Sequence, residues 1–213
     1  MIECKLKSEV FIELNEQRLD VLTELINMGI GRAASVMNQM LTQKVQLQPP
    51  SVKLMSLAEF ISTVQSQSKE YSTVKMDFSG MYNGSCALIF PPQSAANLVS
   101  VLVGEEEATN ELNSVKSSTL SEVGNIVINS VLGSLAKNTN NKFDYSLPIY
   151  REGDITISLR GTNKKVSFDI LIVRTQFIVS SLKVTGEMTL IFSPDSMPNL
   201  ASDLDRLLAN GLT

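Results

Sequence analysis

The chain of 213 residues contains no histidine and only two cysteines. The lack of histidine excludes a Ser-His-Asp or Cys-His nucleophile and every metal site that needs an imidazole ligand. The two cysteines, Cys4 and Cys86, lie far apart and form no CxxC pair. A zinc site or a disulfide framework is therefore not indicated, and we expect a reducing compartment. Any catalysis must use other polar groups.

Long apolar runs and a strong excess of one charge are also missing. The 18 basic and 22 acidic residues give a net charge of -4, with no segment that concentrates Lys and Arg. We therefore expect neither nucleic-acid binding nor a membrane surface as a partner. No apolar run could span a bilayer, and the first residues do not resemble a signal peptide. With 43% hydrophobic residues, the composition is that of a globular protein, which we expect to be cytoplasmic.

Hydrophobic periodicity predicts an alternation of helices and short strands. Apolar residues at three- and four-residue spacing predict a first helix from Glu16 to about Thr42 and a second from about Glu111 to Lys137. Shorter helices are expected at Gln93–Val103 and about Ser196–Leu208. Alternating segments predict strands at Val45–Leu47, Ser51–Met55, Tyr71–Phe78, Cys86–Phe90, Ile155–Leu159, Val166–Phe177 and Lys183–Phe192. The polar stretch Gly104–Asn110 is expected to be a connection.

The order of these elements occurs twice, and so does part of the sequence. Residues 87–98 align with residues 189–200 at an offset of 102, which duplicates a strand, a turn and a helix start. We predict one α+β domain made of two repeats, about 12–104 and 109–211, in which helices pack against an antiparallel sheet with pseudo-twofold symmetry. Two separate domains are the alternative, but the connection between the repeats is short.

Each long helix carries a stripe of polar residues opposite its apolar face. In the first helix Asp20, Glu24, Asn27 and Gly31 share one narrow stripe because they are spaced at i, i+4, i+7 and i+11. In the second helix the same spacing recurs 98 residues later. The two prolines that come after the helices are also 98 residues apart. The second set consists of Ser118, Glu122, Asn125 and Asn129, and the prolines are Pro50 and Pro148.

A single such stripe has an ordinary explanation, because a surface Glu favours solubility and packing tolerates an occasional Asn. Two matched copies favour a function, since Asn is a poor helix former and helix stability does not require it twice. Gly29, Gly31 and Gly124 also cost stability within helices, which indicates a close approach. The sequence leaves open whether a partner surface or the underlying sheet makes that approach.

The pattern Asp/Ser-x3-Glu-x2-Asn-x22-Pro resembles the signature of the CheC, CheX and FliY family, which dephosphorylates the chemotaxis response regulator CheY. Asp20, Glu24, Asn27 and Pro50 match it, and the second set, Ser118, Glu122, Asn125 and Pro148, matches it again. The length and the two repeats are most similar to stand-alone CheC. The resemblance covers nearly the whole chain and implies an α+β fold with duplicated halves.

The resemblance implies hydrolysis of an aspartyl phosphate on a receiver domain. Asn27 and Asn125 would orient the attacking water, as a Gln does in small GTPases. By similarity, Glu24 and Glu122 would pair with a receiver lysine, and Asp20 and Ser118 would assist. The receiver would bring its own Mg²⁺, so no metal or cofactor is expected on this chain.

Pro50 and Pro148 have a structural interpretation, because proline fixes its own φ and makes the preceding residue extended. Each is expected to direct the return of the chain beside the helix that carries the motif.

Two alternatives stay open. The chain could be an adaptor without turnover that binds a receiver or a CheD-like deamidase, a partner that the family resemblance implies. It could also be a flagellar-motor component, although it has no room for the switch domain of FliY. Two sites in one chain make dimerisation unnecessary for symmetry, so we expect a monomer.

Overall fold

A computed structural model describes residues 14–40, 44–66, 68–103, 112–160, 169–179 and 182–211 of the chain. The first half contains α1 (Glu16–Met40), β1 (Val45–Leu47), β2 (Ser51–Ser56), α2 (Leu57–Gln65), β3 (Tyr71–Gly80), β4 (Gly84–Phe90) and α3 (Pro92–Val103). The second half contains α4 (Leu112–Thr139), β5 (Phe143–Tyr145), β6 (Ile149–Gly153), α5 (Ile155–Arg160), β7 (Asp169–Val179), β8 (Leu182–Phe192), the 3-10 turn η1 (Pro194–Ser196) and α6 (Met197–Ala209). The predicted α+β class is confirmed.

The strands form one antiparallel sheet in which each half contributes strands to the other. The order is β1-β7-β8-β4-β3-β5, with β2 also paired to β7 and β6 also paired to β3. Strands β1 and β2 of the first half therefore lie beside β7 of the second half, and β5 and β6 of the second half lie beside β3 of the first. Because the halves exchange strands in this way, among the described residues β1 and β2 pair only with a strand of the second half, and β5 and β6 only with a strand of the first.

The register of the sheet matches the spacing found in the sequence. In the central β4–β8 pair, Ala87 lies opposite Thr189, its counterpart at the offset of 102. At the two edges, Val45 pairs with Val179, and Phe143 pairs with Gly80. Val45 and Phe143 are separated by the same 98 residues as the polar motifs. This is the register that a local twofold axis requires, while the two-repeat boundaries stay a prediction.

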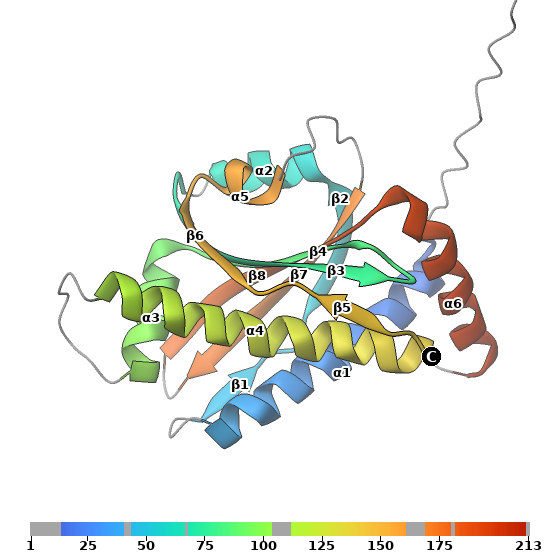
Figure 1. The fold of residues 1–213 in the computed structure, drawn as a ribbon, viewed down its shortest axis with the longest axis horizontal. Helices are drawn as coiled ribbons and strands as arrows, with labels where there is room; N and C mark the ends of the chain where they lie inside the picture. Colours follow the sequence, from blue (N-terminus) through green and yellow to red (C-terminus); the bar gives the residue numbers. More distant parts are fainter. Residues whose placement is uncertain are drawn as a thin grey trace, which may run out of the picture.

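The sheet is covered on both faces, which gives three layers (Figure 1). The larger core lies between one face and the helices α1, α3, α4 and α6. The smaller core lies between the other face and the short helices α2 and α5. Because β4 is buried on both faces, its sequence is a continuous apolar run, Cys86–Phe90, as expected of a central strand.

Helix α2 was absent from the sequence prediction, although the sequence contains its start signal. Ser56 and Glu59 form the Ser-x-x-Glu pattern of a capping box, and the Ser56 side chain accepts a hydrogen bond from the Glu59 backbone N–H at 3.1 Å. Leu57, Phe60, Ile61 and Val64 then bury one helical face at the spacing i, i+3, i+4, i+7.

The prediction of a strand at Ile155–Leu159 is wrong, because these residues form helix α5. The side chain of Asp154 accepts a hydrogen bond from the Thr156 backbone N–H at 2.7 Å, and its carbonyl accepts the N–H of Ile157 at 3.1 Å. Ile155 and Leu159 are buried while Ile157 is 68% exposed. A strand would place all three on one face, whereas a helix puts only the i, i+4 pair together.

The other predicted helices and strands are confirmed within a few residues at their ends. The exceptions are parts that lie outside the described residues: the last residues of the first predicted helix, the connection Gly104–Asn110 and the first residues of the segment Val166–Phe177. Strands β5 (Phe-Asp-Tyr) and β6 (Ile-Tyr-Arg-Glu-Gly) were not predicted.

Candidate active site

The motif residues of α1 lie on its solvent face. Asn15 begins the helix, since its side-chain oxygen accepts the Arg18 backbone N–H at 3.0 Å. Asp20 and Glu24 are exposed and Asn27 is half-buried, whereas the opposite face of the helix is fully buried in the larger core. The polar stripe therefore lies at the edge of that core, with Asn27 nearest to it.

The motif residues of α4 have the same exposure but a different local network. Ser118 and Glu122 are exposed and Asn125 is half-buried. The amide nitrogen of Asn129 donates a hydrogen bond of 2.7 Å to Oδ1 of Asn125. Oδ1 of Asn129 is buried and has no partner among the described residues. The corresponding position in α1 is Gly31, so Asn27 has no such neighbour.

The two helices pack directly against each other, and a glycine makes this possible. A Cβ atom added to Gly29 would lie 2.5 Å from Cα of Val131 on α4. A Cβ on Gly124 would lie 2.4 Å from a methyl carbon of Val74 in the sheet, whereas a Cβ on Gly31 would meet nothing within 4 Å. Gly29 thus permits a helix contact and Gly124 a sheet contact. Both motifs are carried by neighbouring helices on one face of the sheet (Figure 1).

The two motif prolines lie at equivalent places in the sheet. Pro50 immediately precedes β2, and Pro148 immediately precedes β6. Strand β2 contacts α1, and β6 contacts α4. Both prolines are half-buried and neither has a group that could take part in acid–base chemistry.

A basic residue two positions before each motif anchors its helix. Arg18 donates two hydrogen bonds of 2.8 Å to the two carboxylate oxygens of Asp205 on α6. Lys116, which lies 98 residues later, forms an ion pair with Glu152 on β6. The Arg18 hydrogen bonds lower the pKa of Asp205. The sequence analysis missed both basic residues, although the offset of 98 relates them, and no such offset relates their acidic partners.

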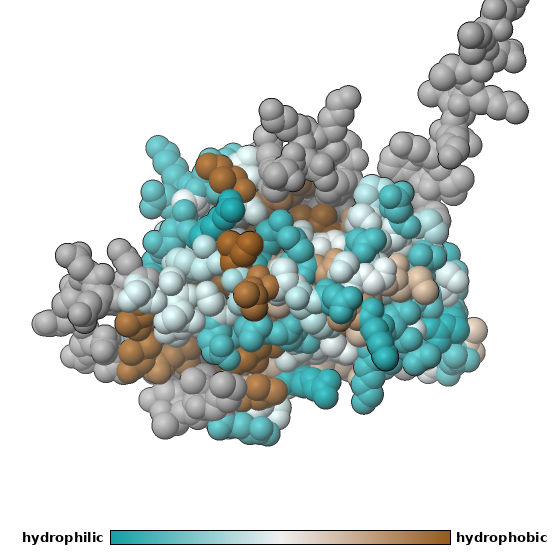
Figure 2. Space-filling model, viewed as in Figure 1, coloured by the Kyte–Doolittle hydropathy of each residue, from teal (hydrophilic) through white to brown (hydrophobic). Residues whose placement is uncertain are grey.

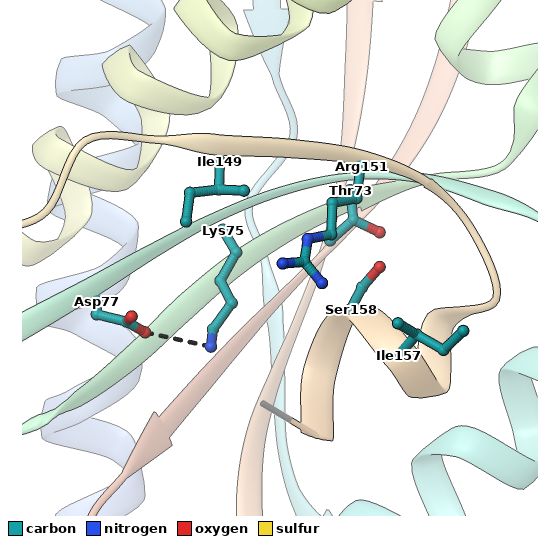
Figure 3. A pocket seen from close by; sticks show the side chains of 7 residues that line it. All are labelled: Thr73, Lys75, Asp77, Ile149, Arg151, Ile157 and Ser158. Carbon is teal, nitrogen blue, oxygen red and sulfur yellow. Dashed lines mark ion pairs between the residues drawn. The ribbon is translucent and has the colours of Figure 1, made fainter. Parts of the chain in front are cut away.

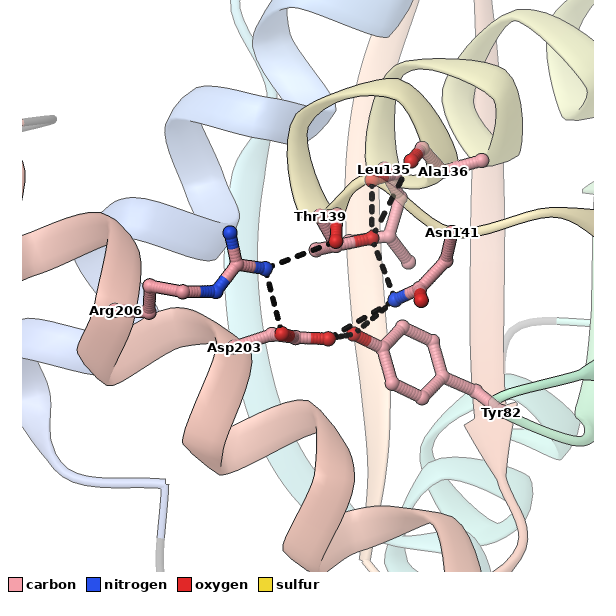
Figure 4. A network of polar contacts seen from close by, with 7 residues as sticks. All are labelled: Tyr82, Leu135, Ala136, Thr139, Asn141, Asp203 and Arg206. Atoms are coloured by element: carbon pink, nitrogen blue, oxygen red, sulfur yellow. Dashed lines mark hydrogen bonds and ion pairs between the residues drawn. The ribbon is translucent and has the colours of Figure 1, made fainter.

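The C-terminal end of α4 is held by a network of polar side chains (Figure 4). Asp203 on α6 accepts hydrogen bonds from the hydroxyl of Tyr82, from Asn141 at 2.9 Å and from Arg206 at 2.6 Å. Arg206 also donates to the carbonyl of Thr139 at 2.9 Å. Burial would raise the pKa of Asp203, but the hydrogen bonds from Tyr82, Arg206 and Asn141 outweigh it and lower the pKa.

The end of α1 has a simpler anchor. The side-chain amide of Asn38 donates to the Val45 carbonyl at 2.8 Å and accepts the Val45 N–H at 2.7 Å. This pair joins the helix to β1, the strand that follows it. Both motif helices are therefore fixed at their ends, by different residues, which is what a preorganised site requires.

The described residues hold no group of three or more Cys, Asp or Glu side chains that could bind a metal. Cys86 is buried, and burial raises the pKa of its thiol. Cys4 lies outside the described residues. None of the described helices is long and apolar enough to cross a membrane.

Two family models match the chain, and each contains one of the motifs. The model described as the CheC-like family matches residues 18–54, which include Asp20, Glu24, Asn27 and Pro50. The model described as chemotaxis phosphatase CheX matches residues 72–171. The motif residues within this second range are Ser118, Glu122, Asn125 and Pro148.

Two curated relatives from Bacillus subtilis are similar in sequence. The CheY-P phosphatase CheC is 30% identical over 142 residues, which are 65% of this chain and 68% of the relative. The flagellar motor switch phosphatase FliY is 25% identical over 178 residues, which cover 83% of this chain but only 45% of that relative.

Three solved structures share the fold. FliY from Thermotoga maritima has a TM-score of 0.73 at 18% identity and covers 91% of this chain and 98% of its own. FliM from H. pylori, solved as a complex with SpeE, has a TM-score of 0.67 at 13% identity, covering 91% and 97%. The CheX–CheY–BeF3–Mg complex from Borrelia burgdorferi has a TM-score of 0.51 at 21% identity, covering 85% and 98%.

Proposed function

Because the chain belongs to the CheC-like family of chemotaxis phosphatases, we propose that it hydrolyses the aspartyl phosphate of a CheY-like receiver domain. The observation that carries this proposal is the duplicated polar stripe. Glu24 and Asn27 on α1, and Glu122 and Asn125 on α4, have matching exposure at matching spacing. A rigid helix that offers a carboxylate and, one turn later, an amide can dock on a partner and orient a water at the same time.

In the proposed reaction, the oxygen of a water attacks phosphorus in line with the bond to the aspartate carboxylate. That P–O bond breaks, so the products are the free aspartate and inorganic phosphate, and the water proton is released. Asn27 and Asn125 hold the water through their amides, which do not change protonation state. Mg²⁺ bound by the receiver and a receiver lysine would neutralise the developing charge, so this chain needs no metal of its own.

Glu24 and Glu122 would pair with the receiver lysine and fix the register of the complex. Charge pairs at an interface contribute orientation and association rate more reliably than affinity. Asp20 and Ser118 lie one turn earlier on the same faces and would extend the contact. Pro50 and Pro148 would position β2 and β6 beside the motif helices without taking part in chemistry.

The test is phosphate release from a phosphorylated receiver in excess over this chain. We expect repeated turnovers above the receiver's own rate, and loss of this gain in the double variant Asn27→Ala, Asn125→Ala. Asn199→Ala is the matched control, because Asn199 is an exposed asparagine on α6 that belongs to neither motif. Full activity in the double variant would refute the assignment.

A second candidate is an adaptor without turnover, which binds a receiver or a CheD-like deamidase. The fold is compatible with it, since FliM shares the fold and was solved bound to another protein, SpeE. An adaptor would bind the phosphorylated receiver but release no phosphate above the receiver's own rate. The same assay therefore separates the two candidates.

A further inference from the structure

A second polar site lies on the sheet face that carries α5, opposite the face that carries the motif helices. It is a pocket of about 220 Å³ between β3, β6 and α5 (Figure 3). A cavity of only about 10–15 Å³ can hold one water molecule, so this pocket has room for a small molecule. It is lined by Thr73, Lys75, Asp77, Ile149, Arg151, Ile157 and Ser158.

The strand register brings the polar residues of the pocket together. Thr73 pairs with Arg151 across β3 and β6, and Lys75 pairs with Ile149. Neighbours in a strand point to opposite faces, so Val74 lies in the larger core while Thr73 and Lys75 face α5. Ser158 on α5 then closes the pocket from the other side.

Thr73 carries the main observation. Thr73 is 1% exposed, and its hydroxyl has no hydrogen-bond partner among the described residues. A buried hydroxyl without a partner is destabilising, so such groups are rare in folded proteins. Figure 3 shows the hydroxyls of Thr73 and Ser158 pointing toward each other across the pocket, with the guanidinium of Arg151 beside them.

The charge of the pocket is positive by one unit. Lys75 forms an ion pair of 3.2 Å with Asp77, which neutralises it. Arg151 is exposed and has no carboxylate partner among the described residues. A guanidinium flanked by two hydroxyl donors matches an oxyanion, because the guanidinium can donate two parallel hydrogen bonds.

We propose that this pocket binds a small tetrahedral oxyanion of the phosphate type. The donors lie on β3, β6 and α5 and so approach the pocket from different directions. A tetrahedral anion offers acceptors in several directions, whereas a planar carboxylate offers them in a single plane. Thr73 and Ser158 donate hydroxyl hydrogen bonds, Arg151 supplies the charge, and Lys75 contributes once Asp77 is displaced or screened. This inference does not rest on the proposed phosphatase activity, because it involves neither motif.

The experiment measures thermal unfolding of the full chain with inorganic phosphate, against sodium chloride at matched ionic strength. A ligand that binds only the folded state raises the midpoint. We expect phosphate to raise it and acetate to raise it less. Arg151→Gln should weaken phosphate binding about ten- to hundredfold, and Thr73→Val about three- to tenfold.

The Thr73→Val variant separates binding from folding. It keeps the shape and removes only the hydroxyl, so its midpoint without phosphate should be at least that of the parent chain. Asp77→Asn should strengthen phosphate binding, because it removes the carboxylate that competes for Lys75. The proposal is overturned if phosphate shifts the midpoint no more than chloride, or if Thr73→Val and Arg151→Gln respond as the parent does.

Discussion

The two motif helices occupy equivalent places in the fold but differ in how they hold the amide that we assign to catalysis. On α4, Asn129 donates a hydrogen bond of 2.7 Å to Oδ1 of Asn125, so the orientation of that amide is fixed. On α1 the equivalent residue is Gly31, and Asn27 has no neighbour of this kind. Preorganised polar groups stabilise a transition state better than groups that must reorient. The comparison predicts that the α4 site is the faster one.

The helices also differ in how they are anchored. Arg18 makes a two-point contact with Asp205, whereas Lys116 makes a single ion pair with Glu152. The end of α4 is held by the Tyr82–Asp203 network and the end of α1 by the Asn38–Val45 pair. The duplicated helices therefore keep the motif at matching positions while their supporting contacts differ.

The face of the molecule that carries α4 has no uniformly polar or apolar surface (Figure 2). Figure 2 shows mixed polar and apolar side chains over the face that carries α4, with apolar side chains over β6 and α5. Leu147, Ile149 and Ile157 are among the exposed large hydrophobic residues of this region.

The largest expected effect comes from removing one amide at a time. Asn27→Ala leaves only the α4 site, and Asn125→Ala leaves only the α1 site. Each substitution should slow its own site about 10²–10³-fold, which is the cost of losing one positioned polar donor. Phosphate release per chain measures what is left, and Asn27→Ala should retain the larger share. Equal residual rates would show that Asn129 gives the α4 site no advantage.

The next effect concerns the contact between the helices. Gly29→Ala places a methyl group against the backbone of Val131 and should destabilise the chain by about 1–3 kcal/mol. Gly31→Ala is the matched control, because a Cβ there meets nothing and should stabilise the helix by roughly 0.5–1 kcal/mol. Urea unfolding of both variants measures the difference. Similar stabilities would mean that the helices do not cross at Gly29.

A smaller effect is expected at Asn129. In the Asn27→Ala background, Asn129→Ala should slow phosphate release about two- to tenfold, the cost of one neutral hydrogen bond. In the Asn125→Ala background the same substitution should have no effect, since only the α1 site is active there. An equal loss in both backgrounds would indicate a general structural role for Asn129 rather than positioning of Asn125.

The smallest effect is a dependence of stability on pH at the C-terminal end of α4, which the uncharged Asn38–Val45 pair at the end of α1 does not share. The pKa of Asp203 is lowered in the folded chain, so its carboxylate stabilises the fold above the unfolded pKa. This contribution is lost as the pH falls below about 4 and through the folded pKa. Asp203→Asn should reduce the fall in the free energy of unfolding at acid pH. Asn38→Ala should lower the free energy of unfolding by the same amount at every pH.

The sequence predicts those parts of the fold that depend on local periodicity. The two long helices and the long strands follow from regular apolar spacing, and the motifs follow from a duplication at a fixed offset. The strand at Ile155–Leu159 was predicted wrongly because β-branched residues favour strands, while the cap at Asp154 and the burial of Ile155 with Leu159 favour a helix. Helix α2 had a visible capping box, so it could have been predicted.

Contacts between distant residues could not be predicted. The sequence left open whether a partner surface or the sheet approaches the helix glycines. In the structure, helix α4 of the same chain approaches Gly29 and the sheet approaches Gly124. The bond from Tyr82 to Asp203 joins residues 121 positions apart. The pocket around Thr73 depends on the register of β3 with β6, which no local pattern specifies.

The central claim is that Asn27 and Asn125 act on the reaction rather than on docking. The most direct test measures, for the double variant Asn27→Ala, Asn125→Ala, both its affinity for a receiver held in its phosphorylated form by beryllium fluoride and its hydrolysis rate at saturating phosphorylated receiver. We predict an affinity within a few-fold of that of the parent chain and a hydrolysis rate no higher than that of the receiver alone. Retained hydrolysis at saturation would contradict it, and so would an activity loss explained entirely by weaker binding.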